Sequence, residues 1–370
     1  MWVGLVLVVA IVAALAAATY VHVSDKRRKP AEQISSGDVA VRLDAFWSWW
    51  REAAPRLAAT VDTGQADSIV GELSTRVHAI DPGLDWETGP GLKGARHHLA
   101  LSAEGDMKLR ALTERWLSRA PPADNNWEYY PARQAFSRKG VTLVDARDVL
   151  IDVDSVRVGL ETDSTREVVN VSFSHPALAK LDELQRARAA FLTLDNLLGE
   201  DGVERWVGEI TTTAAPLPEA KPVEALATAV DTLRRAATGE RFAIVEFKTR
   251  DGHPIVATVN LALKRIDHLL MDEHLAINIA LLHPRRDGMT TNEEAPELNA
   301  LEHELSASLE QDSVYIGRET GEGIRTIHFH VASAGPAELR ARSWATQHPE
   351  RKIEIVLKHD PQWDVLQRWK

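Results

Sequence analysis

Residues 313–331 read SVYIGRETGEGIRTIHFHV, and this stretch decides the fold of the C-terminal part of the chain. Residues 313–320 and 325–331 are rich in the β-branched and aromatic residues that are typical of strands. Gly321 and Gly323 lie between the two runs, and tight turns accept glycine more readily than any other residue. The stretch therefore predicts a β-hairpin.

Apolar periodicity predicts the elements that surround this hairpin. They are strands at 242–249, 255–263 and 275–282, a helix at 296–309, a helix at 337–347 and a strand at 352–358. From the third of these strands onward, the order is strand-helix-strand-strand-helix-strand, which is that of a ferredoxin-like domain. The two earlier strands are expected to extend the same sheet.

A segment containing Ala-Pro-Leu-Pro and Lys-Pro, residues 211–222, is typical of a linker between domains. It separates an N-terminal domain at 41–210 from a C-terminal domain at 223–370. In the N-terminal domain, periodicity predicts strands and a helix at 176–198 that ends at Gly199. The predicted fold class is α+β, with two ferredoxin-like (α/β sandwich) domains that follow an N-terminal transmembrane helix.

An internal repeat links the two domains. The matching pairs, each offset by 232 residues (304 − 72 and 319 − 87), are Glu72-Leu73-Ser74 with Glu304-Leu305-Ser306 and Glu87-Thr88-Gly89 with Glu319-Thr320-Gly321. Their shared order on elements of the same predicted kind favours duplication of a helix-hairpin-helix unit. The alternative is that two α+β domains of similar topology use the same common turn and helix residues.

The first 25 residues contain an uncharged run from Trp2 to Val21, which as a helix would span about 30 Å, the thickness of the hydrocarbon core of a bilayer. A basic flank and tether, residues 26–40, begins with Lys26-Arg27-Arg28-Lys29, and such clusters stay on the cytoplasmic side. We therefore expect a single-pass anchor in the inner (plasma) membrane, with the N-terminus outside and the body in the cytoplasm. The alternative is a signal peptide cleaved near Ala16-Ala17-Ala18, followed by secretion.

Charge and composition disfavour some partners and chemistries. The net charge is −11, and residues 25–29 contribute four positive charges and one negative charge. The remaining body has 39 basic residues (43 − 4) and 53 acidic residues (54 − 1), or −14. Nucleic-acid phosphates repel a body that acidic, so no direct nucleic-acid partner is expected. The chain has no cysteine, which excludes disulfides, thiolate ligands and a Cys nucleophile.

The C-terminal domain carries a distinctive set of residues at distinctive spacing between positions 241 and 369. They are Arg285, Arg286, Asp287, Gly288, Glu293, Glu294, Leu298, Leu301, Glu302, Leu305, Gly317, Arg318, Thr320, Phe329 and the run Asp360-Pro361-Gln362-Trp363. In this set the domain resembles the domain-of-unknown-function family 695. The family has no established reaction, so the resemblance implies a fold. Some relatives join such a domain to one resembling a ribonuclease E inhibitor, which implies control of RNA processing through a protein partner.

Three arginines of this set are candidates for a binding surface. Arg285, Arg286 and Arg318 could form an anion-binding patch near Asp287-Gly288, because guanidinium groups bind carboxylates and phosphates. The other interpretation, which we favour, makes them structural ion-pair partners of Asp360 and of the glutamates.

The acidic residues of the set also have two interpretations. Glu293, Glu294 and Glu302 lie at the start and in the body of the helix at 296–309, and paired carboxylates can serve as acid and base. We favour the interpretation that they complement the helix dipole and solvate the outer face. The run from Asp360 to Trp363 is expected to cap the fold, with Trp363 covering the sheet edge.

Two further motifs suggest ligands. Gly89-x-Gly91-x-x-Gly94 has the letters of a dinucleotide fingerprint, but a strand is predicted at 96–102 where the fingerprint requires a helix, so we interpret it as a hairpin turn.

The second motif is a pair of histidines. His328 and His330 share one face of a strand and could gather a metal with His283 or His303. Ordinary half-buried or surface histidines are the favoured interpretation, so we predict no metal site and no cofactor.

The sequence thus leaves function open between three hypotheses. The leading one is a non-catalytic binding or regulatory module that meets a protein partner and is held at the membrane through Trp2 to Val21. The second is an enzyme with a cleft near Arg285, Arg318 and Asp360. The third is a regulator of RNA processing that acts through a protein partner.

Overall fold

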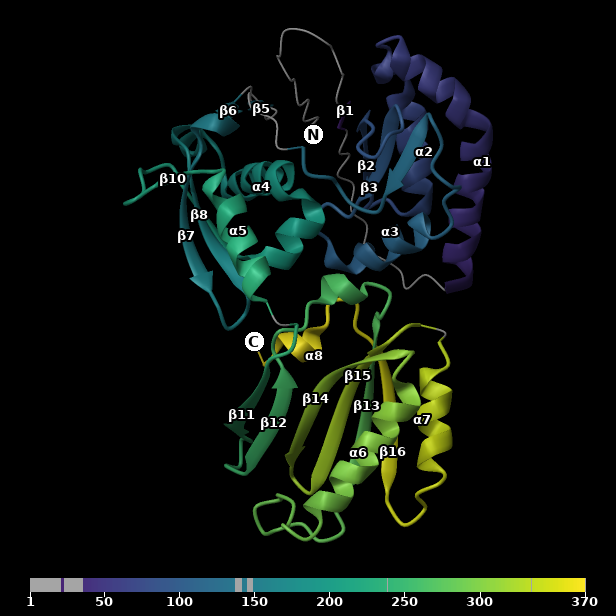
Figure 1. Ribbon diagram of the computed structural model, residues 1–370, viewed down its shortest axis with the longest axis vertical. Coiled ribbons are helices and arrows are strands. Elements are labelled where there is room, and N and C mark those ends of the chain that lie inside the picture. The colour runs from purple at the N-terminus through teal and green to yellow at the C-terminus, as the bar shows by residue number, and fades with distance from the viewer. Residues whose placement is uncertain are drawn as a thin grey trace. The chain divides into compact units, whose positions relative to one another are not determined.

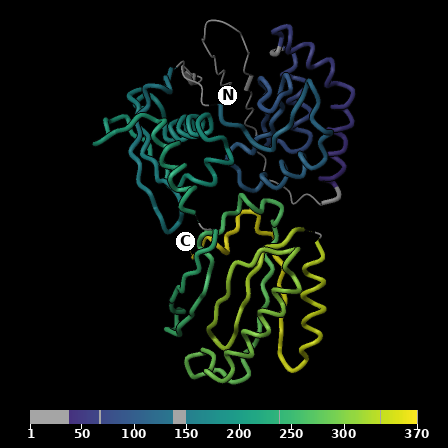
Figure 2. Tube along the Cα trace, in the orientation of Figure 1, coloured from purple at the N-terminus to yellow at the C-terminus, as the bar shows by residue number. Residues whose placement is uncertain are grey.

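The computed structural model describes residues 21–22, 36–136, 142–144, 149–237, 239–333 and 335–369 (Figure 1). The chain divides into two compact units, Met1–Ala236 and Ala237–Lys370, called here the N-terminal unit and the C-terminal unit. Figure 2 traces the path of the chain through each unit.

The C-terminal unit is built on one six-stranded antiparallel sheet. In sheet order the strands are β11 (Phe242–Lys248), β12 (Pro254–Asn260), β14 (Ser313–Gly321), β15 (Ile324–Val331), β13 (Glu273–Ala280) and β16 (Ile353–His359). Helix α6 (Ala295–Leu309) connects β13 to β14, and helix α7 (Ala337–Ala345) connects β15 to β16. The last four strands and these helices have the predicted strand-helix-strand-strand-helix-strand order, and β11 and β12 extend the sheet as expected.

The two faces of this sheet carry separate cores, because side chains alternate between the faces along a strand. On one face, Ile277 of β13 and Phe329 of β15 pack against α6 and α7. On the other face, Val259 of β12 packs with Trp363 and with Leu366 of the short helix α8 (Asp364–Gln367). The C-terminal segment therefore covers part of the face that the two long helices leave open.

The N-terminal unit contains two four-stranded sheets. The first has the order β1 (Val21–His22), β2 (Asp85–Pro90), β3 (His97–Ser102) and β4 (Trp127–Tyr130). Helices α1 (Ser36–Asp62), α2 (Val70–Ile80) and α3 (Arg110–Leu117) share one hydrophobic core with one face of this sheet. The indole rings of Trp47, Trp50, Trp86, Trp116 and Trp127 are buried in that core.

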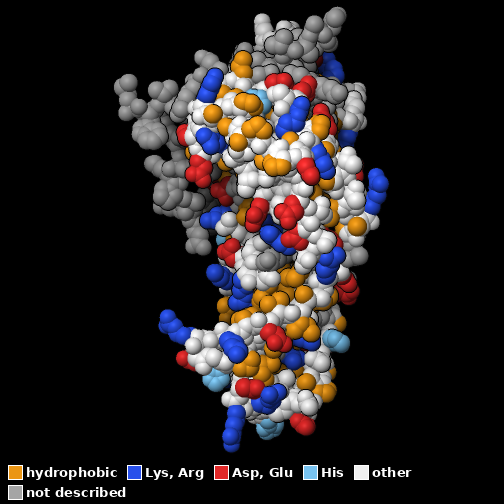
Figure 3. Space-filling view, turned by 90° about the vertical axis from the view of Figure 1, so that its left-hand side faces the viewer, with side chains coloured by type: hydrophobic (Ala, Val, Ile, Leu, Met, Phe, Trp, Pro, Cys, Tyr) orange, Lys and Arg blue, Asp and Glu red, His pale blue; other side chains and the backbone are white. Residues whose placement is uncertain are grey.

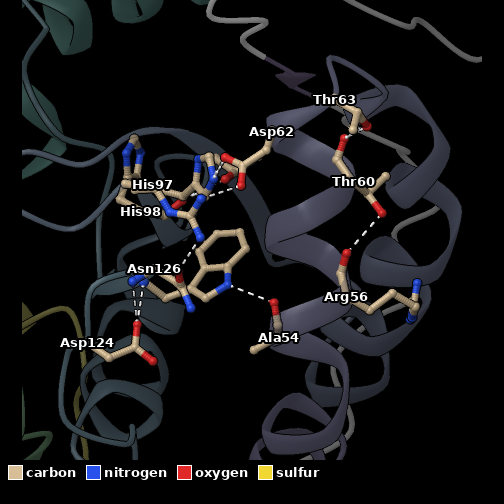
Figure 4. A network of polar contacts seen from close by, with 12 residues as sticks. Ala54, Arg56, Thr60, Asp62, Thr63, His97, His98, Asp124 and Asn126 are labelled. Atoms are coloured by element: carbon tan, nitrogen blue, oxygen red, sulfur yellow. Dashed lines mark hydrogen bonds and ion pairs between the residues drawn. The ribbon is translucent and has the colours of Figure 1, made fainter.

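Polar contacts at the end of α1 hold it to the first sheet (Figure 4). The Asp62 carboxylate lies 2.6 Å from Arg96 Nη1 and 2.8 Å from His97 Nε2. About two turns earlier in the helix, the Ala54 carbonyl accepts a 3.0 Å hydrogen bond from Trp127 Nε1. These contacts fix β3 and β4 against a helix that lies far from them in sequence.

The second sheet has the order β10 (Lys221–Pro222), β7 (Arg157–Asp163), β8 (Val168–Ser174) and β9 (Val207–Thr213). Helix α4 (Glu183–Trp206) makes a crossover between the parallel strands β8 and β9, and α5 (Ala225–Ala236) contacts β7 and β8. A short pair, β5 (Thr142–Val144) and β6 (Leu150–Asp152), precedes this sheet. The 3-10 helices of the described chain are Ala66–Ile69, Met107–Leu109, Val153–Ser155, Pro176–Lys180 and Arg265–His268.

The N-terminal unit differs from the predicted single ferredoxin-like domain. Strand β4 pairs directly and in parallel with β3, where a ferredoxin-like sheet places an antiparallel strand between them. In the C-terminal unit the intervening strand is β13, which precedes α6. In the N-terminal unit helix α1 stands at the corresponding place, before α2, so no strand is available to lie between β3 and β4. The predicted linker, 211–222, contributes to β9 and β10, so the boundary between the units follows Ala236 instead.

The predicted transmembrane helix is the second correction to the fold class. Among the residues that the structure describes, no helix is both long and apolar enough to cross a membrane. The predicted segment, Trp2 to Val21, lies outside the described residues except for Val21. That residue lies in β1, opposite Thr88 of β2, so it does not end a helix as predicted. The observed fold class is α+β.

The elements predicted from the internal repeat occur in both units. The order α2-β2-β3-α3 in the N-terminal unit corresponds to α6-β14-β15-α7 in the C-terminal unit. Glu87 and Glu319 each lie on the first strand of a hairpin, and each carboxylate lies near a histidine of the second strand. Glu87 Oε1 is 3.7 Å from His98 Nε2, and Glu319 Oε1 is 3.5 Å from His328 Nε2.

Candidate functional site

The C-terminal sheet has two edge strands, β11 and β16. Strand β16 exposes Val356 and Leu357, whereas β11 exposes three large apolar side chains, and we call the unpaired side of β11 the open edge. Within the described part of the chain, strand β11 pairs only with β12, along an uninterrupted register from Phe242 to Lys248. The exposed fractions of its apolar side chains are 50% for Phe242, 71% for Ile244 and 38% for Phe247. Unprotected apolar edge strands are sites where a further strand can pair.

The backbone of β11 alternates between bonding to β12 and facing the free edge. The Arg241 carbonyl accepts a 2.9 Å bond from the Leu261 N–H, and the Thr249 N–H donates a 2.9 Å bond to the His253 carbonyl. In an antiparallel pair the residues that bond to the neighbour alternate with those that do not. The odd-numbered residues of β11 therefore bond to β12. The even-numbered ones, from Phe242 to Lys248, direct N–H and C=O groups to the free edge.

Among the residues that the structure describes, no layer covers one face of β11. The core under α6 and α7 draws its strand residues from β13, β15, β14 and β16, and none from β11 or β12. The side chains of Phe242, Ile244, Glu246 and Lys248 lie on that uncovered face and are exposed. Figure 1 shows β11 and β12 extending beyond the two helices, and Figure 3 shows hydrophobic side chains among charged ones on this side of the unit.

A second grouping lies in the N-terminal unit, where carboxylates surround the guanidinium of Arg133. Arg133 Nε is 3.5 Å from Glu87 Oε2, Nη1 is 3.8 Å from Asp195 Oδ2, and Nη2 bonds to Glu104. The backbone N–H of Arg133 donates a 3.2 Å bond to Glu200 Oε2. We call these residues, with the neighbouring Asp85, the carboxylate cluster. It joins the polar face of the first sheet to α4.

Burial shifts the acid-base behaviour of this cluster. Burial, followed by the neighbouring Glu104 carboxylate, raises the pKa of Asp85 to about 8. Burial and the nearby Glu200 hold the pKa of Asp195 well above its ordinary range, and burial likewise raises the pKa of Glu200. Burial therefore favours the protonated carboxyl at Asp85, Asp195 and Glu200, and the side chains of the cluster are nearly all inaccessible to solvent. We interpret it as the polar interior that holds the two sheets of the unit together.

The glycine-containing motif at 89–94 forms the connection between β2 and β3, so the strand predicted after it is confirmed. The loop binds an anion of the chain itself. The Glu128 carboxylate accepts bonds from the backbone N–H groups of Leu92, Lys93 and Ala95, the last at 3.4 Å. The N–H groups that a dinucleotide phosphate would need are thus used by Glu128.

The histidines proposed for a metal bond to their neighbours instead. His328 Nδ1 lies 3.0 Å from His274 Nε2, and His330 Nδ1 lies 3.1 Å from the Met271 carbonyl. Burial, followed by the two neighbouring histidines, lowers the pKa of His274 to about 3. In the described part of the chain, no three His, Asp or Glu residues are grouped so that they could hold a metal.

Glu302 and Arg318, both named from the sequence, meet between α6 and β14. Arg318 Nη1 lies 3.0 Å from Glu302 Oε2, and Tyr315 donates a 2.6 Å hydrogen bond to Glu302 Oε1. Arg325 Nη1 lies 3.9 Å from the same carboxylate. Gly317 lies at a β-bulge, where a Cβ would come within 2.3 Å of the Thr258 carbonyl oxygen. This group ties the helix to the sheet.

Glu294 closes the loop that follows β13. Its carboxylate accepts bonds from the N–H groups of Leu282, at 2.8 Å, and His283, at 3.2 Å, and also pairs with the buried Arg351. Glu293 is exposed nearby.

The residues at 285–288 form a tight turn in the same loop. Arg285 pairs with Asp287 at 2.8 Å, and Arg286 is exposed. Gly288 has φ +78°, and its carbonyl accepts a 2.8 Å bond from the Gly323 N–H in the β14–β15 turn.

Asp360 and Trp363 hold the C-terminal segment on the sheet. Asp360 accepts a 2.8 Å bond from the Asp364 N–H, and it lies 3.4 Å from His330 Nε2. Burial raises the pKa of Asp360, but the bonds from His330 and from the backbone outweigh it and lower the pKa to about 2. The ring of Trp363 stacks on that of His330, with 4.2 Å between the ring centroids. Trp363 was predicted to cover the edge of the sheet, but it covers one of the faces.

The structure does not bring Arg285, Arg318 and Asp360 into one cleft. Asp360 bonds to Asp272 at the start of β13, whereas residues 285–288 follow the end of that strand. Because β13 has 8 residues, the two places are about 25 Å apart. Arg318 pairs with α6 on one face of the sheet and Asp360 with His330 on the other. Of the structural ion pairs expected for the arginines, Arg318 with Glu302 is present, whereas Arg285 pairs with Asp287 and Asp360 with His330.

Neither the open edge nor the carboxylate cluster was predicted from the sequence. The signal for the cluster was the alternation along β2, where Asp85 and Glu87 share one face and Trp86 and Thr88 share the other. The signal for the edge was an apolar strand that comes first among the predicted strands of the C-terminal domain and is joined to the next strand with no helix between them.

Comparison with known proteins agrees with the predicted resemblance. Residues 245–368 match DUF695, a family of unknown function. The match includes every position between 285 and 363 that carried the resemblance. Comparison with curated proteins and with solved structures yields no match. The family match therefore supports the assignment of the C-terminal unit and supplies no activity.

Proposed function

We propose that this chain is a non-catalytic binding module whose C-terminal unit accepts an extended segment of a protein partner as a further strand beside β11. The observation that carries the proposal is Ile244, whose side chain is 71% exposed and whose backbone groups face the free edge. Strand addition supplies affinity through main-chain hydrogen bonds, and alternate side chains supply specificity.

The side chains of β11 define the chemistry of the segment that fits. Phe242 and Ile244 would pair with apolar side chains or with the aliphatic stems of long polar ones. Glu246 and Lys248 would accept neighbours of opposite charge and disfavour like charges directly opposite. The predicted role in RNA processing is a narrower form of this proposal, in which the partner would belong to a ribonuclease assembly.

The test replaces Ile244 with Lys, which adds a charge to the edge without removing a core residue. The control is Leu339→Lys on α7, because Leu339 is 72% exposed and the change in charge is the same. Crosslinking in intact cells with a C-terminal tag, followed by mass spectrometry, should show a stoichiometric partner. We expect Ile244→Lys to reduce its capture by about tenfold or more, which is about 1.4 kcal/mol, and Leu339→Lys to leave it unchanged.

A photo-reactive residue placed at position 244, and for comparison at 339, gives an independent measurement. The proposal requires an adduct with the same partner from position 244 and none from position 339. Equal capture by both lysine variants, together with equal labelling from both positions, would overturn it.

A further inference from the structure

We infer that the segment which β11 accepts is the β11 strand of a second copy of this chain, so that two C-terminal units join into one continuous sheet. The inference rests on the proposed function and names the partner. Its basis is the pattern of the strand itself, in its backbone and in its side chains.

The backbone of β11 matches itself when a second strand runs antiparallel about a two-fold axis through Val245. This register places Phe242 opposite Lys248 and Ile244 opposite Glu246. All four of these residues direct their N–H and C=O groups to the free edge, as the bonds of Arg241 and Thr249 to the β12 side require. Each can therefore donate and accept one bond across the new pair, with no residue of the strand left over.

The side chains fit the same register. The exposed rings and methyl groups of Phe242 and Ile244 lie opposite the aliphatic stems of Lys248 and Glu246, which can cover them while the charges stay in water. On the other face Phe247, 38% exposed, lies opposite Ala243, and Val245 lies opposite its own copy. A shift that centres the pair on Glu246 would set two carboxylates directly opposite, which is unfavourable.

Two strands of this length bury less surface than the roughly 800 Å² per partner of a standard stable interface. We therefore expect a weak dimer whose population rises with protein concentration. Analytical ultracentrifugation of the full chain should show it, and Ile244→Lys should abolish it while Leu339→Lys should not.

The absence of cysteine from the chain allows a test of the register. Residues 245 of the two copies would form a non-hydrogen-bonded pair with Cα atoms about 4.5 Å apart, which is within disulfide range. Val245→Cys should therefore form a disulfide-linked dimer on mild oxidation. Ala243→Cys and Phe247→Cys should each fail to link to themselves but should link to each other when the two variants are mixed.

The outcomes separate this inference from the proposed function. A concentration-dependent dimer that links through position 245 supports the inference. A chain that stays monomeric, or a dimer that does not link at 245, overturns it. If the monomeric chain still captures another protein in cells, and Ile244→Lys abolishes that capture, the proposed function stands without the inference. If Ile244→Lys changes neither association nor capture, both fail.

Discussion

At the scale of single residues, Asp85 couples the stability of the N-terminal unit to pH. Burial and Glu104 raise its pKa from 3.8 to about 8, so the folded chain holds this proton more tightly than the unfolded chain. The resulting stability is fully present below the unfolded pKa, near pH 4, and is lost as the pH rises through about 8. The unit should therefore become less stable between these values.

Asp85→Asn tests this coupling. Asparagine cannot ionise, and its side-chain oxygen can still accept the 2.8 Å bond from the Trp86 N–H. Each unit of pKa difference is worth about 1.4 kcal/mol, so the gain in stability over wild type should grow by on the order of 3 kcal/mol between pH 5 and pH 8. Denaturant unfolding at both pH values measures it, with Asp251→Asn at an exposed turn as the control. A gain that does not change with pH would contradict the assignment.

At the scale of elements, Gly288 explains why part of the family pattern is structural. Its φ is +78°, and a Cβ there would lie 2.7 Å from the backbone nitrogen of Glu322. Gly252 in the β11–β12 turn has φ +86° and no atom within 4 Å of such a Cβ. The two positions thus share the backbone conformation and differ in crowding.

We expect Gly252→Ala to cost about 1 kcal/mol, for the left-handed conformation alone. Gly288→Ala should cost roughly 2 kcal/mol more, because two loops must move apart. Thermal unfolding of the two variants compares them directly. Equal losses would show that the contact between the two turns has no energetic role.

The elements of the C-terminal unit could be predicted because each is encoded locally. The alternation of apolar and polar residues predicted the strands, and apolar residues at helical spacing predicted the helices. Gly321 and Gly323 predicted the turn of the hairpin. Within α4, the backbone leaves the helical conformation at Gly199 (φ +71°, ψ 161°), where the helix was predicted to end, and a second helical stretch then continues to Trp206. A Cβ at Gly199 would also lie 3.0 Å from the Ala135 backbone nitrogen, so this glycine serves close packing as well. That contact is absent from the local sequence pattern.

At the scale of the whole molecule, the two units have separate hydrophobic cores. Both cores of the C-terminal unit draw only on residues from 243 to 369. We therefore expect a fragment that starts at Ala237 to unfold cooperatively on its own and to retain its sheet. Circular dichroism and calorimetry of this fragment measure it, and a fragment that remains unfolded would contradict the division of the chain.

The arrangement of the N-terminal unit could not be predicted at this scale, because its contacts join segments far apart in sequence. The direct parallel pairing of β3 with β4 follows from the position of helix α1, which stands where the C-terminal unit has a strand. The carboxylate cluster brings Glu87, Arg133 and Asp195 together from separate elements. No local pattern specifies such contacts. The prediction that Glu294 and Glu302 solvate the outer face of their helix was wrong for the same reason, because both are buried and Glu302 pairs with Arg318 of the sheet.

The most direct test of the central claim, that β11 accepts a strand, is residue-resolved amide hydrogen exchange of the full chain at low and high concentration and in the presence of the captured partner. The amides of Phe242, Ile244, Glu246 and Lys248 face the free edge, and those of Ala243, Val245 and Phe247 face β12. We predict fast exchange of the first set in the dilute chain and protection on association, with the second set protected throughout. Exchange of the first set that is slow in the dilute chain, or that association leaves unchanged, would contradict the claim.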